Sequence, residues 1–181
     1  MISREQLREI FRSYLIMQSE AEVWWLLKKL KRVKPLNTIM EVGISPGSVK
    51  LWEQVLKKGG LFIGVDSTPS LNVKLLYFWD YKKSDRKIQL VEGDCRESAT
   101  KLKVQELLRK EKTKVDFLYI DARPTYSDIA AAFNNFKDLV RKGGAIGFHD
   151  INNEEVLKFF NLLKGEKAMI QIARGIGIYY V

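Results

Sequence analysis

The stretch TIMEVGISPGSVKLWEQVLKKGGLFIGVD (38–66) contains two apolar runs, which are separated by a glycine turn and a helix-like segment. The first run ends near Glu41 and the second ends on Asp66. Short runs of Val, Ile, Leu and Phe that alternate with helical segments are typical of parallel strands joined by crossover helices. The stretch therefore predicts a β-α-β unit.

The same pattern recurs three more times along the chain. Each further run is apolar and finishes on an acid: IQLVEGD (88–94) on Asp94, VDFLYID (115–121) on Asp121 and AIGFHD (145–150) on Asp150. A single acid at a strand end is commonly a helix cap or a turn residue. Five acids at successive strand ends instead predict a binding pocket, because ligands of parallel sheets bind outside the carboxyl ends of the strands.

The segments around these runs show the periodicity of helices. Ser3 begins a capping box with Gln6, so a helix is expected at 3–16. A second helix is expected at 21–33, where Pro35 stops it. Further helices are expected within 43–58 and at 70–83, 97–112, 124–140 and 153–163. Two short runs around Arg174-Gly175, at 168–173 and 175–181, predict a terminal antiparallel hairpin.

A short motif that occurs twice in the chain supports a helix-to-strand unit that is used twice. KKGGLFIGVD (57–66) and RKGGAIGFHD (141–150) share a basic helix end, two glycines and a final Asp. The glycines are expected to take a left-handed conformation after the helix. Because no linker or change in composition interrupts the chain, we expect one domain over 1–181, with N-terminal helices at 1–35 and a core fold at 37–181.

Composition is typical of a compact intracellular protein. With 181 residues and 46% hydrophobic content, the chain can bury a core without disulfides. Its single cysteine, Cys95, fits a reducing cytosol. The N-terminus carries charges where a signal peptide needs an apolar run, and no stretch reaches the length of a membrane span. We therefore expect a cytoplasmic protein without a membrane partner.

The net charge of +9 suggests a nucleic-acid partner. The basic residues concentrate at 26–34, 82–87 and 101–114. Two of these segments lie on expected helices, where Lys and Arg would face solvent, and no aromatic residues alternate with them as in a single-strand-binding groove. A solvated basic surface and a polyanionic partner both stay open.

The loop after the first run argues for a particular cofactor. Gly43 allows a tight turn and Gly47 allows close backbone approach to a ligand. The spacing differs from the G-x-G-x-x-G of dinucleotide folds, and Glu41 would repel a pyrophosphate but suits a cationic amino-acid group. Asp66 is placed to accept hydrogen bonds from ribose hydroxyls, and Asp94-Cys95 to bind adenine. Ribose, adenine and an ammonium group together describe S-adenosylmethionine.

The expected cofactor-binding set is therefore Glu41, Gly43, Gly47, Ser48, Asp66, Ser67, Asp94, Cys95 and Asp121.

From about residue 37 to residue 181 the chain resembles class I S-adenosylmethionine-dependent methyltransferases. The likeness is greatest to the small O-methyltransferases related to macrocin, cephalosporin-pathway and catechol O-methyltransferases. Its motifs are Glu41-Val42-Gly43 with Gly47-Ser48-Val49, the run Phe117–Tyr126, Lys142-Gly143-Gly144 and His149-Asp150. The resemblance implies an α/β Rossmann-like fold with a seven-stranded, mostly parallel sheet, an antiparallel last strand and helices on both faces, here with an N-terminal helical extension.

The chain departs from the family pattern at two places. Ser48 replaces the second glycine of the loop, and Pro46 stiffens it. Ala122-Arg123-Pro124 replaces the usual Gly-Asp-His, so the family's candidate proton-handling histidine is missing there. No Asn/Asp-Pro-Pro-Tyr motif of amino-methylating nucleic-acid enzymes follows the fourth run.

Asp121, His149 and Asp150 are the expected catalytic residues. Asp121 and Asp150 end adjacent strands of the implied sheet and match metal ligands of the related enzymes, so they are candidates to hold Mg²⁺. Arg123 places a cation nearby that could replace the metal. His149, the only histidine, is either a structural residue or a base beside a carboxylate.

The favoured function is S-adenosylmethionine-dependent O-methylation of a small molecule. The alternative is an S-adenosylmethionine-binding or catalytically altered protein that acts on or with RNA. The helices at 3–16 and 21–33, with Trp24 and Trp25, and the aromatic segment 77–81 are the expected cover of the pocket. The two helices could also form a homodimer interface.

Overall fold

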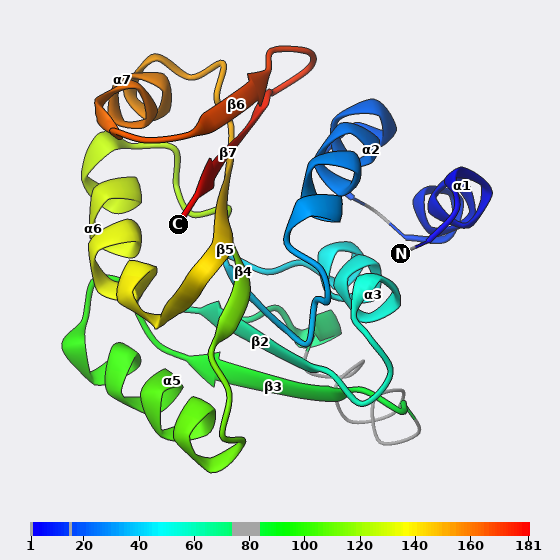
Figure 1. Ribbon diagram of the computed structural model, residues 1–181, viewed down its shortest axis with the longest axis vertical. Helices are drawn as coiled ribbons and strands as arrows, with labels where there is room; N and C mark the ends of the chain where they lie inside the picture. Colours follow the sequence, from blue (N-terminus) through cyan, green and yellow to red (C-terminus); the bar gives the residue numbers. More distant parts are fainter. Residues whose placement is uncertain (1, 15, 74–83) are drawn as a thin grey trace.

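A seven-stranded sheet forms the centre of the computed structural model, which describes residues 2–14, 16–73 and 84–181 (Figure 1). The strands lie in the order β3-β2-β1-β4-β5-β7-β6. Their bounds are β1 Thr38–Val42, β2 Leu61–Asp66, β3 Lys87–Glu92, β4 Val115–Ile120, β5 Val140–His149, β6 Lys167–Ile170 and β7 Ile176–Tyr180.

The first five strands run parallel. β1 pairs with β2 and β4, β2 pairs with β3, and β4 pairs with β5, all in parallel. β7 is antiparallel to both β5 and β6. These pairings confirm the predicted Rossmann-like sheet and its antiparallel last strand. They also bring the carboxyl ends of β1 to β5 to one edge of the sheet.

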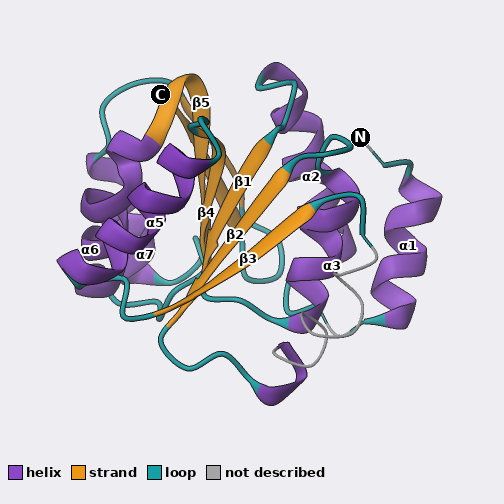
Figure 2. Cartoon of the chain, turned by 90° about the horizontal axis from the view of Figure 1, so that it is seen from below, coloured by secondary structure: helices purple, strands orange, loops and turns teal. Residues whose placement is uncertain are grey.

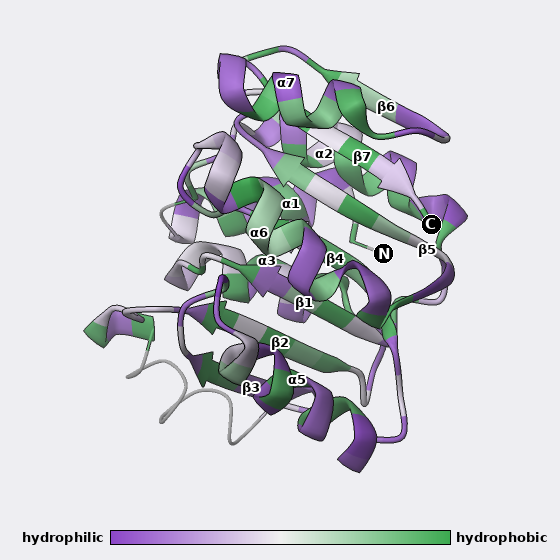
Figure 3. Ribbon diagram, turned by 90° about the vertical axis from the view of Figure 1, so that its left-hand side faces the viewer, coloured by the Kyte–Doolittle hydropathy of each residue, from purple (hydrophilic) through white to green (hydrophobic). Residues whose placement is uncertain are grey.

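Helices cover both faces of the sheet (Figure 2). One face carries α1 (Arg4–Ser13), α2 (Glu20–Lys29) and α3 (Pro46–Val55), and the other carries α5 (Ser98–Lys110), α6 (Tyr126–Phe136) and α7 (Glu154–Leu162). Strand side chains alternate between the two cores, so Phe117 and Tyr119 pack on the α3 side while Leu118 and Ile120 pack on the other side. Both faces of the central strands β1 and β4 are therefore closed to water, and apolar colouring follows these strands in Figure 3.

Several element boundaries differ from the sequence prediction. The second helix ends at Lys29 and continues as a 3₁₀ turn over Leu30–Arg32. β5 begins at Val140 instead of Ala145, because Val115 pairs with Val140 across a register irregularity. Gly59 and Gly143 have the expected positive φ of 74° and 73°, but neither caps a helix, because α3 ends at Val55 and Gly143 lies within β5. Most of the helix expected at 70–83, including the aromatic segment 77–81, lies outside the described residues.

The N-terminal helices are part of the main core. Both begin with a capping box, in which Ser3 pairs with Gln6 as predicted and Ser19 pairs with Glu22. Their Leu7, Leu26 and Leu27 are buried in the cluster that contains the inner side chains of β1 and β4. Trp24 and Trp25 are partly buried against the same cluster. These helices therefore cover one face of the sheet.

No helix in the described residues is long and apolar enough to cross a bilayer.

Replacing Leu26 by Ala tests how tightly α2 belongs to this core. Leu26 is 1% exposed, so Leu26→Ala is expected to lower the free energy of unfolding by about 2–5 kcal/mol, measured by denaturant titration. Leu102→Ala, at a 64% exposed position on α5, is the control and should change it by less than about 0.5 kcal/mol. Equal stability of the two variants would mean that α2 is a dispensable appendage.

Candidate active site

A cavity of about 330 Å³ opens at the carboxyl ends of the strands. Backbone hydrogen bonds hold three of these ends together: Gly43 N donates to Val65 O at 2.8 Å, and Asp121 N donates to Val42 O at 2.8 Å. The cavity is lined by Val42, Gly43, Val65, Asp66, Ser67, Asp94, Cys95, Asp121, Ala122, Arg123 and Asp128. The structure thus gathers six residues of the expected cofactor set on one wall: Gly43, Asp66, Ser67, Asp94, Cys95 and Asp121.

Gly43 makes the tightest backbone contact of the site. Its φ is +80°, and a Cβ added there would lie 2.1 Å from the carbonyl oxygen of Asp121. No side chain fits in that space, and the left-handed conformation also disfavours any residue with a Cβ. Glycine at this position therefore lets the loop after β1 lie directly against the end of β4.

Asp66 is held by the loops on either side of it. Its Oδ2 accepts a hydrogen bond from Ile44 N at 3.1 Å, and its Oδ1 accepts one from Thr68 N at 2.7 Å. These amides fix the carboxylate at the tip of β2. Each carboxylate oxygen has a further lone pair, so the group can still accept hydrogen bonds from a ligand in the cavity.

Asp94 and Cys95 form the wall beyond β3. The Arg96 guanidinium donates hydrogen bonds to both oxygens of the Asp94 carboxylate and lowers the pKa of Asp94 to about 2. Burial, together with the charges of Asp94 and Asp128, raises the pKa of the Cys95 thiol to about 11, so the thiol is uncharged at neutral pH. The Cys95 carbonyl accepts a hydrogen bond from Asn135 at 2.7 Å, which ties this loop to α6.

Glu41, Gly47 and Ser48, the other three residues of the expected cofactor set, do not line the cavity. Glu41 is completely buried and is absent from the cavity lining; its Oε2 accepts a hydrogen bond from Ser48 Oγ at 2.7 Å. Burial raises the pKa of Glu41 well above its ordinary range, and the Ser48 hydrogen bond opposes this only in part. The Glu41 carboxyl lies beneath the loop and supports the start of α3 through its hydrogen bond with Ser48. Gly47 and Ser48 are likewise buried in the first turn of that helix.

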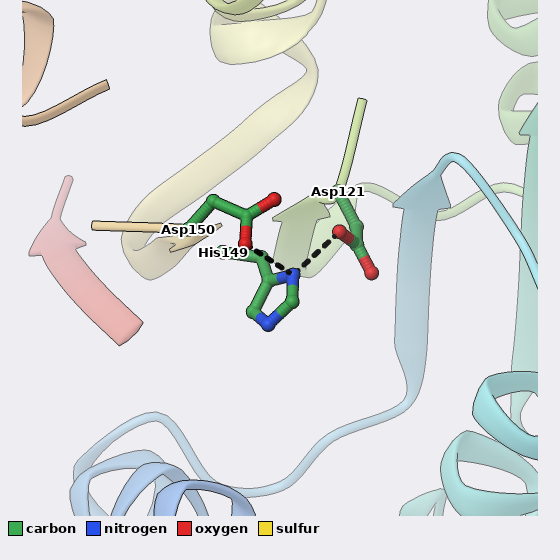
Figure 4. A group of neighbouring side chains, drawn as sticks. All are labelled: Asp121, His149 and Asp150. Atoms are coloured by element: carbon green, nitrogen blue, oxygen red, sulfur yellow. Dashed lines mark hydrogen bonds and ion pairs between the residues drawn. The ribbon is translucent and has the colours of Figure 1, made fainter. Parts of the chain in front are cut away.

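Asp121, His149 and Asp150 come together as predicted (Figure 4). His149 Nδ1 lies 2.8 Å from Asp121 Oδ1 and 3.6 Å from Asp150 Oδ1. Burial opposes a charged imidazole, but the hydrogen bond to Asp121 and the charges of Asp121 and Asp150 outweigh it and raise the pKa of His149 above 6.5. The His149 side chain is only 1% exposed, so it lies behind Asp121 and away from the cavity.

The cluster fits a divalent cation. One ligand atom from each of the three residues lies within 4.8 Å of the others. Two carboxylates suit Mg²⁺, whereas an imidazole nitrogen is not a ligand that this ion prefers. Asp121 and Asp150 are therefore the residues that could hold the ion, and His149 is better suited to holding Asp121. Arg174 Nε lies 3.5 Å from Asp150 Oδ1 and gives that carboxylate a second cationic neighbour.

Three residues near the site were not predicted as binding residues. Asp128 lines the cavity, and its carboxylate lies 3.6 Å from both Arg96 and Arg123. The sequence pattern that could have pointed to Asp128 is the Thr125-x-x-Asp128 spacing, which is typical of a capping box. Gln18 and Glu22 approach from the N-terminal segment, and no local pattern links them to strands that come much later in the sequence.

The family model of a methyltransferase domain matches residues 40–151, which is more than half of the chain. The chain belongs to this methyltransferase family. This membership confirms the predicted resemblance to methyltransferases. Comparison with curated protein sequences gives no match for this methyltransferase.

Solved methyltransferase structures share the fold. MycE from the mycinamycin biosynthetic pathway, in complex with Mg and SAH, has a TM-score of 0.59 at 15% identity, over 87% of this chain and 42% of MycE. An O-methyltransferase from Bacillus cereus in complex with SAH has a TM-score of 0.63 at 16% identity, over 98% and 91% of the two chains. A putative caffeoyl-CoA O-methyltransferase from Staphylococcus aureus has a TM-score of 0.62 at 12% identity, over 98% and 91%.

At these identities the likeness establishes the fold. The methyltransferase spans about two fifths of the length of the MycE chains that it matches.

The contact of Gly43 with Asp121 can be tested by adding one methyl group. Gly59 has a similar φ of +74° with nothing within 4 Å of a built Cβ, so Gly59→Ala isolates the backbone strain, about 1–2 kcal/mol. Gly43→Ala adds the clash with the Asp121 carbonyl and is expected to cost about 1–3 kcal/mol more. Denaturant unfolding of both variants measures the difference, and equal losses would show that the loop relaxes freely.

Proposed function

We propose that this methyltransferase binds S-adenosylmethionine in the strand-end cavity and transfers its methyl group to an oxygen of a small molecule. The observation that carries the proposal is the cavity lining, in which the Asp94-Cys95 pair, Asp66 and Asp121 follow one another along the ends of β3, β2 and β4. The complexes of MycE and of the Bacillus cereus enzyme with SAH support the choice of cofactor.

The cavity residues have separate roles in this proposal. Asp66 accepts hydrogen bonds from the ribose hydroxyls, and the wall formed by Asp94 and Cys95 receives the adenine. The methionine part lies along Gly43, which lines the cavity between Asp66 and Asp121. Asp121 is the carboxylate beside Gly43 that faces the cavity, so it replaces Glu41 as the partner of the ammonium group.

Methyl transfer requires an acceptor oxygen in line with the sulfonium methyl group. The new carbon–oxygen bond forms as the carbon–sulfur bond breaks, the electron pair remains on sulfur, and the acceptor loses its proton. Positioning supplies much of the rate in such a reaction. Asp121 and Asp150 would hold a divalent ion, and that ion would lower the pKa of an acceptor hydroxyl. His149 orients Asp121 through the 2.8 Å contact between Nδ1 and Oδ1.

Titration calorimetry with SAH tests the cofactor assignment. Wild-type protein is expected to bind SAH and to prefer it to NAD. Asp66→Ala removes the acceptors for two ribose hydroxyls, each hydrogen bond being worth roughly 1.5–3 kcal/mol, so affinity should fall at least about tenfold.

Asp138→Ala is the matched control, because Asp138 pairs with Lys101 before β5 begins, at the opposite end of that strand from the cavity. Its affinity for SAH should equal that of the wild type. Tight SAH binding by Asp66→Ala, or a preference for NAD in the wild type, would contradict the cofactor assignment.

A chelator separates the roles of the metal and of His149. SAH release from S-adenosylmethionine, measured with a panel of phenol and sugar acceptors, is expected to stop in chelator and to return with added Mg²⁺. Asp150→Asn should weaken Mg²⁺ binding in calorimetry. Full turnover in chelator combined with loss in His149→Ala would make His149 the base and exclude a metal.

A further inference from the structure

The segment before α2 contacts the acid cluster from the far end of the sequence. The side-chain amide of Gln18 donates a hydrogen bond to Asp121 Oδ2 at 2.7 Å, across a separation of 103 residues. Gln18 is only 6% exposed. Asp121 is the member of the cluster that lines the cavity, so Gln18 contacts the site through this carboxylate.

Gln18 and His149 each contact a different oxygen of the Asp121 carboxylate. His149 Nδ1 lies 2.8 Å from Oδ1 and Gln18 Nε2 lies 2.7 Å from Oδ2. A carboxylate with a single donor can turn about its broad terminal torsion, whereas donors on both oxygens fix its plane. In the described part of the chain, His149 Nε2 has no hydrogen-bond partner, so Asp121 in turn determines how the imidazole ring is held.

The backbone that carries Gln18 is itself anchored to the sheet. Glu22 is completely buried; its Oε2 accepts a hydrogen bond from Ser19 N at 2.7 Å and its Oε1 accepts one from Gly175 N. Gly175 immediately precedes β7, which pairs with β5, the strand that ends on His149. The amide of Gln18 is thus set at a fixed place relative to the strands that carry the cluster.

We propose that Gln18 is a positioning residue of the methyltransferase site, and that it fixes the Asp121 carboxylate in the orientation that a bound cofactor requires. The proposal rests on the proposed function for the use of Asp121. Gln18 does not line the strand-end cavity and acts through Asp121. The N-terminal segment thereby becomes part of the active site without lining it.

Three substitutions of Gln18 test the role of its hydrogen-bond donor separately from that of the size and shape of its side chain. Gln18→Met keeps the length and removes the donor, Gln18→Glu keeps the shape and adds a charge that repels Asp121, and Gln18→Asn keeps an amide on a shorter side chain. The matched control is Gln6→Met, which removes a glutamine hydrogen bond in the capping box of α1, away from Asp121. Val23, Leu26 and Leu51 line the small internal space beside Gln18, so a methionine is expected to fold there.

Two measurements are made on each folded variant. Calorimetry gives the affinity for SAH, and NMR at one fixed pH gives the imidazole resonances of His149, which are unambiguous because the chain has one histidine. Gln18→Met and Gln18→Glu are expected to lose about tenfold in SAH affinity and to shift the His149 resonances. Gln18→Asn should recover part of both effects, and Gln6→Met should change neither.

The outcomes distinguish this proposal from the proposed function. Wild-type affinity for SAH with unshifted His149 resonances in Gln18→Met would reduce Gln18 to a packing residue and overturn the inference. If the wild type does not bind SAH, the proposed function fails, and the His149 resonances alone decide whether Gln18 positions Asp121. Should Gln18→Glu not fold, the comparison of Gln18→Met with Gln18→Asn supports or overturns the inference.

Discussion

The close contact between the loop after β1 and the end of β4 is the constraint on which the site depends. Gly43 lies so near the Asp121 carbonyl that a single methyl group would overlap it. The same loop is joined to β2 by the hydrogen bond from Gly43 N to Val65 O. These contacts place Asp66 and Asp121 on one cavity wall, and a wider separation of β1 from β4 would move the two carboxylates apart.

Burial of polar groups on the α2 side of the sheet would be costly without specific partners. A buried charge that lacks a partner is strongly unfavourable. Removing one member of a buried pair therefore destabilises the fold, because the other member stays buried without a partner. His149 therefore lies against Asp121 and Asp150, and Glu22 accepts two backbone hydrogen bonds. Glu41 meets the same constraint differently, because its burial beneath the loop raises its pKa and so favours the uncharged form of the carboxyl.

The cavity has an acidic inner wall and a rim that carries arginines. Arg96 and Arg123 both lie 3.6 Å from Asp128, and Arg96 also chelates Asp94. The Ala122-Arg123-Pro124 segment, which departs from the family pattern, thus places a cation at the mouth of the cavity with its side chain 73% exposed. The acids of the inner wall suit a cationic cofactor, whereas the rim exposes positive charge to an approaching acceptor.

The sequence alone predicted the alternation of strands and helices, the strand-end acids, the capping box of Ser3 and Gln6, and the meeting of Asp121 with Asp150. These features rest on local periodicity and on strand order, and the family motifs supplied that order. The sequence misplaced Glu41, because a strand-end acid can point into the cavity or into the core, and only the packing of α3 over β1 decided between them.

Only the tertiary structure joined Gln18 to Asp121 and Glu22 to Gly175, across separations of 103 and 153 residues. No periodic signal encodes such a pair, since Gln18, Glu22 and Asp121 are ordinary polar residues in their own segments and Gly175 contributes only its backbone N–H. Their contact exists because α2 packs on the sheet beside β7, and this packing is driven by the apolar side chains of α2 and not by the polar pair itself.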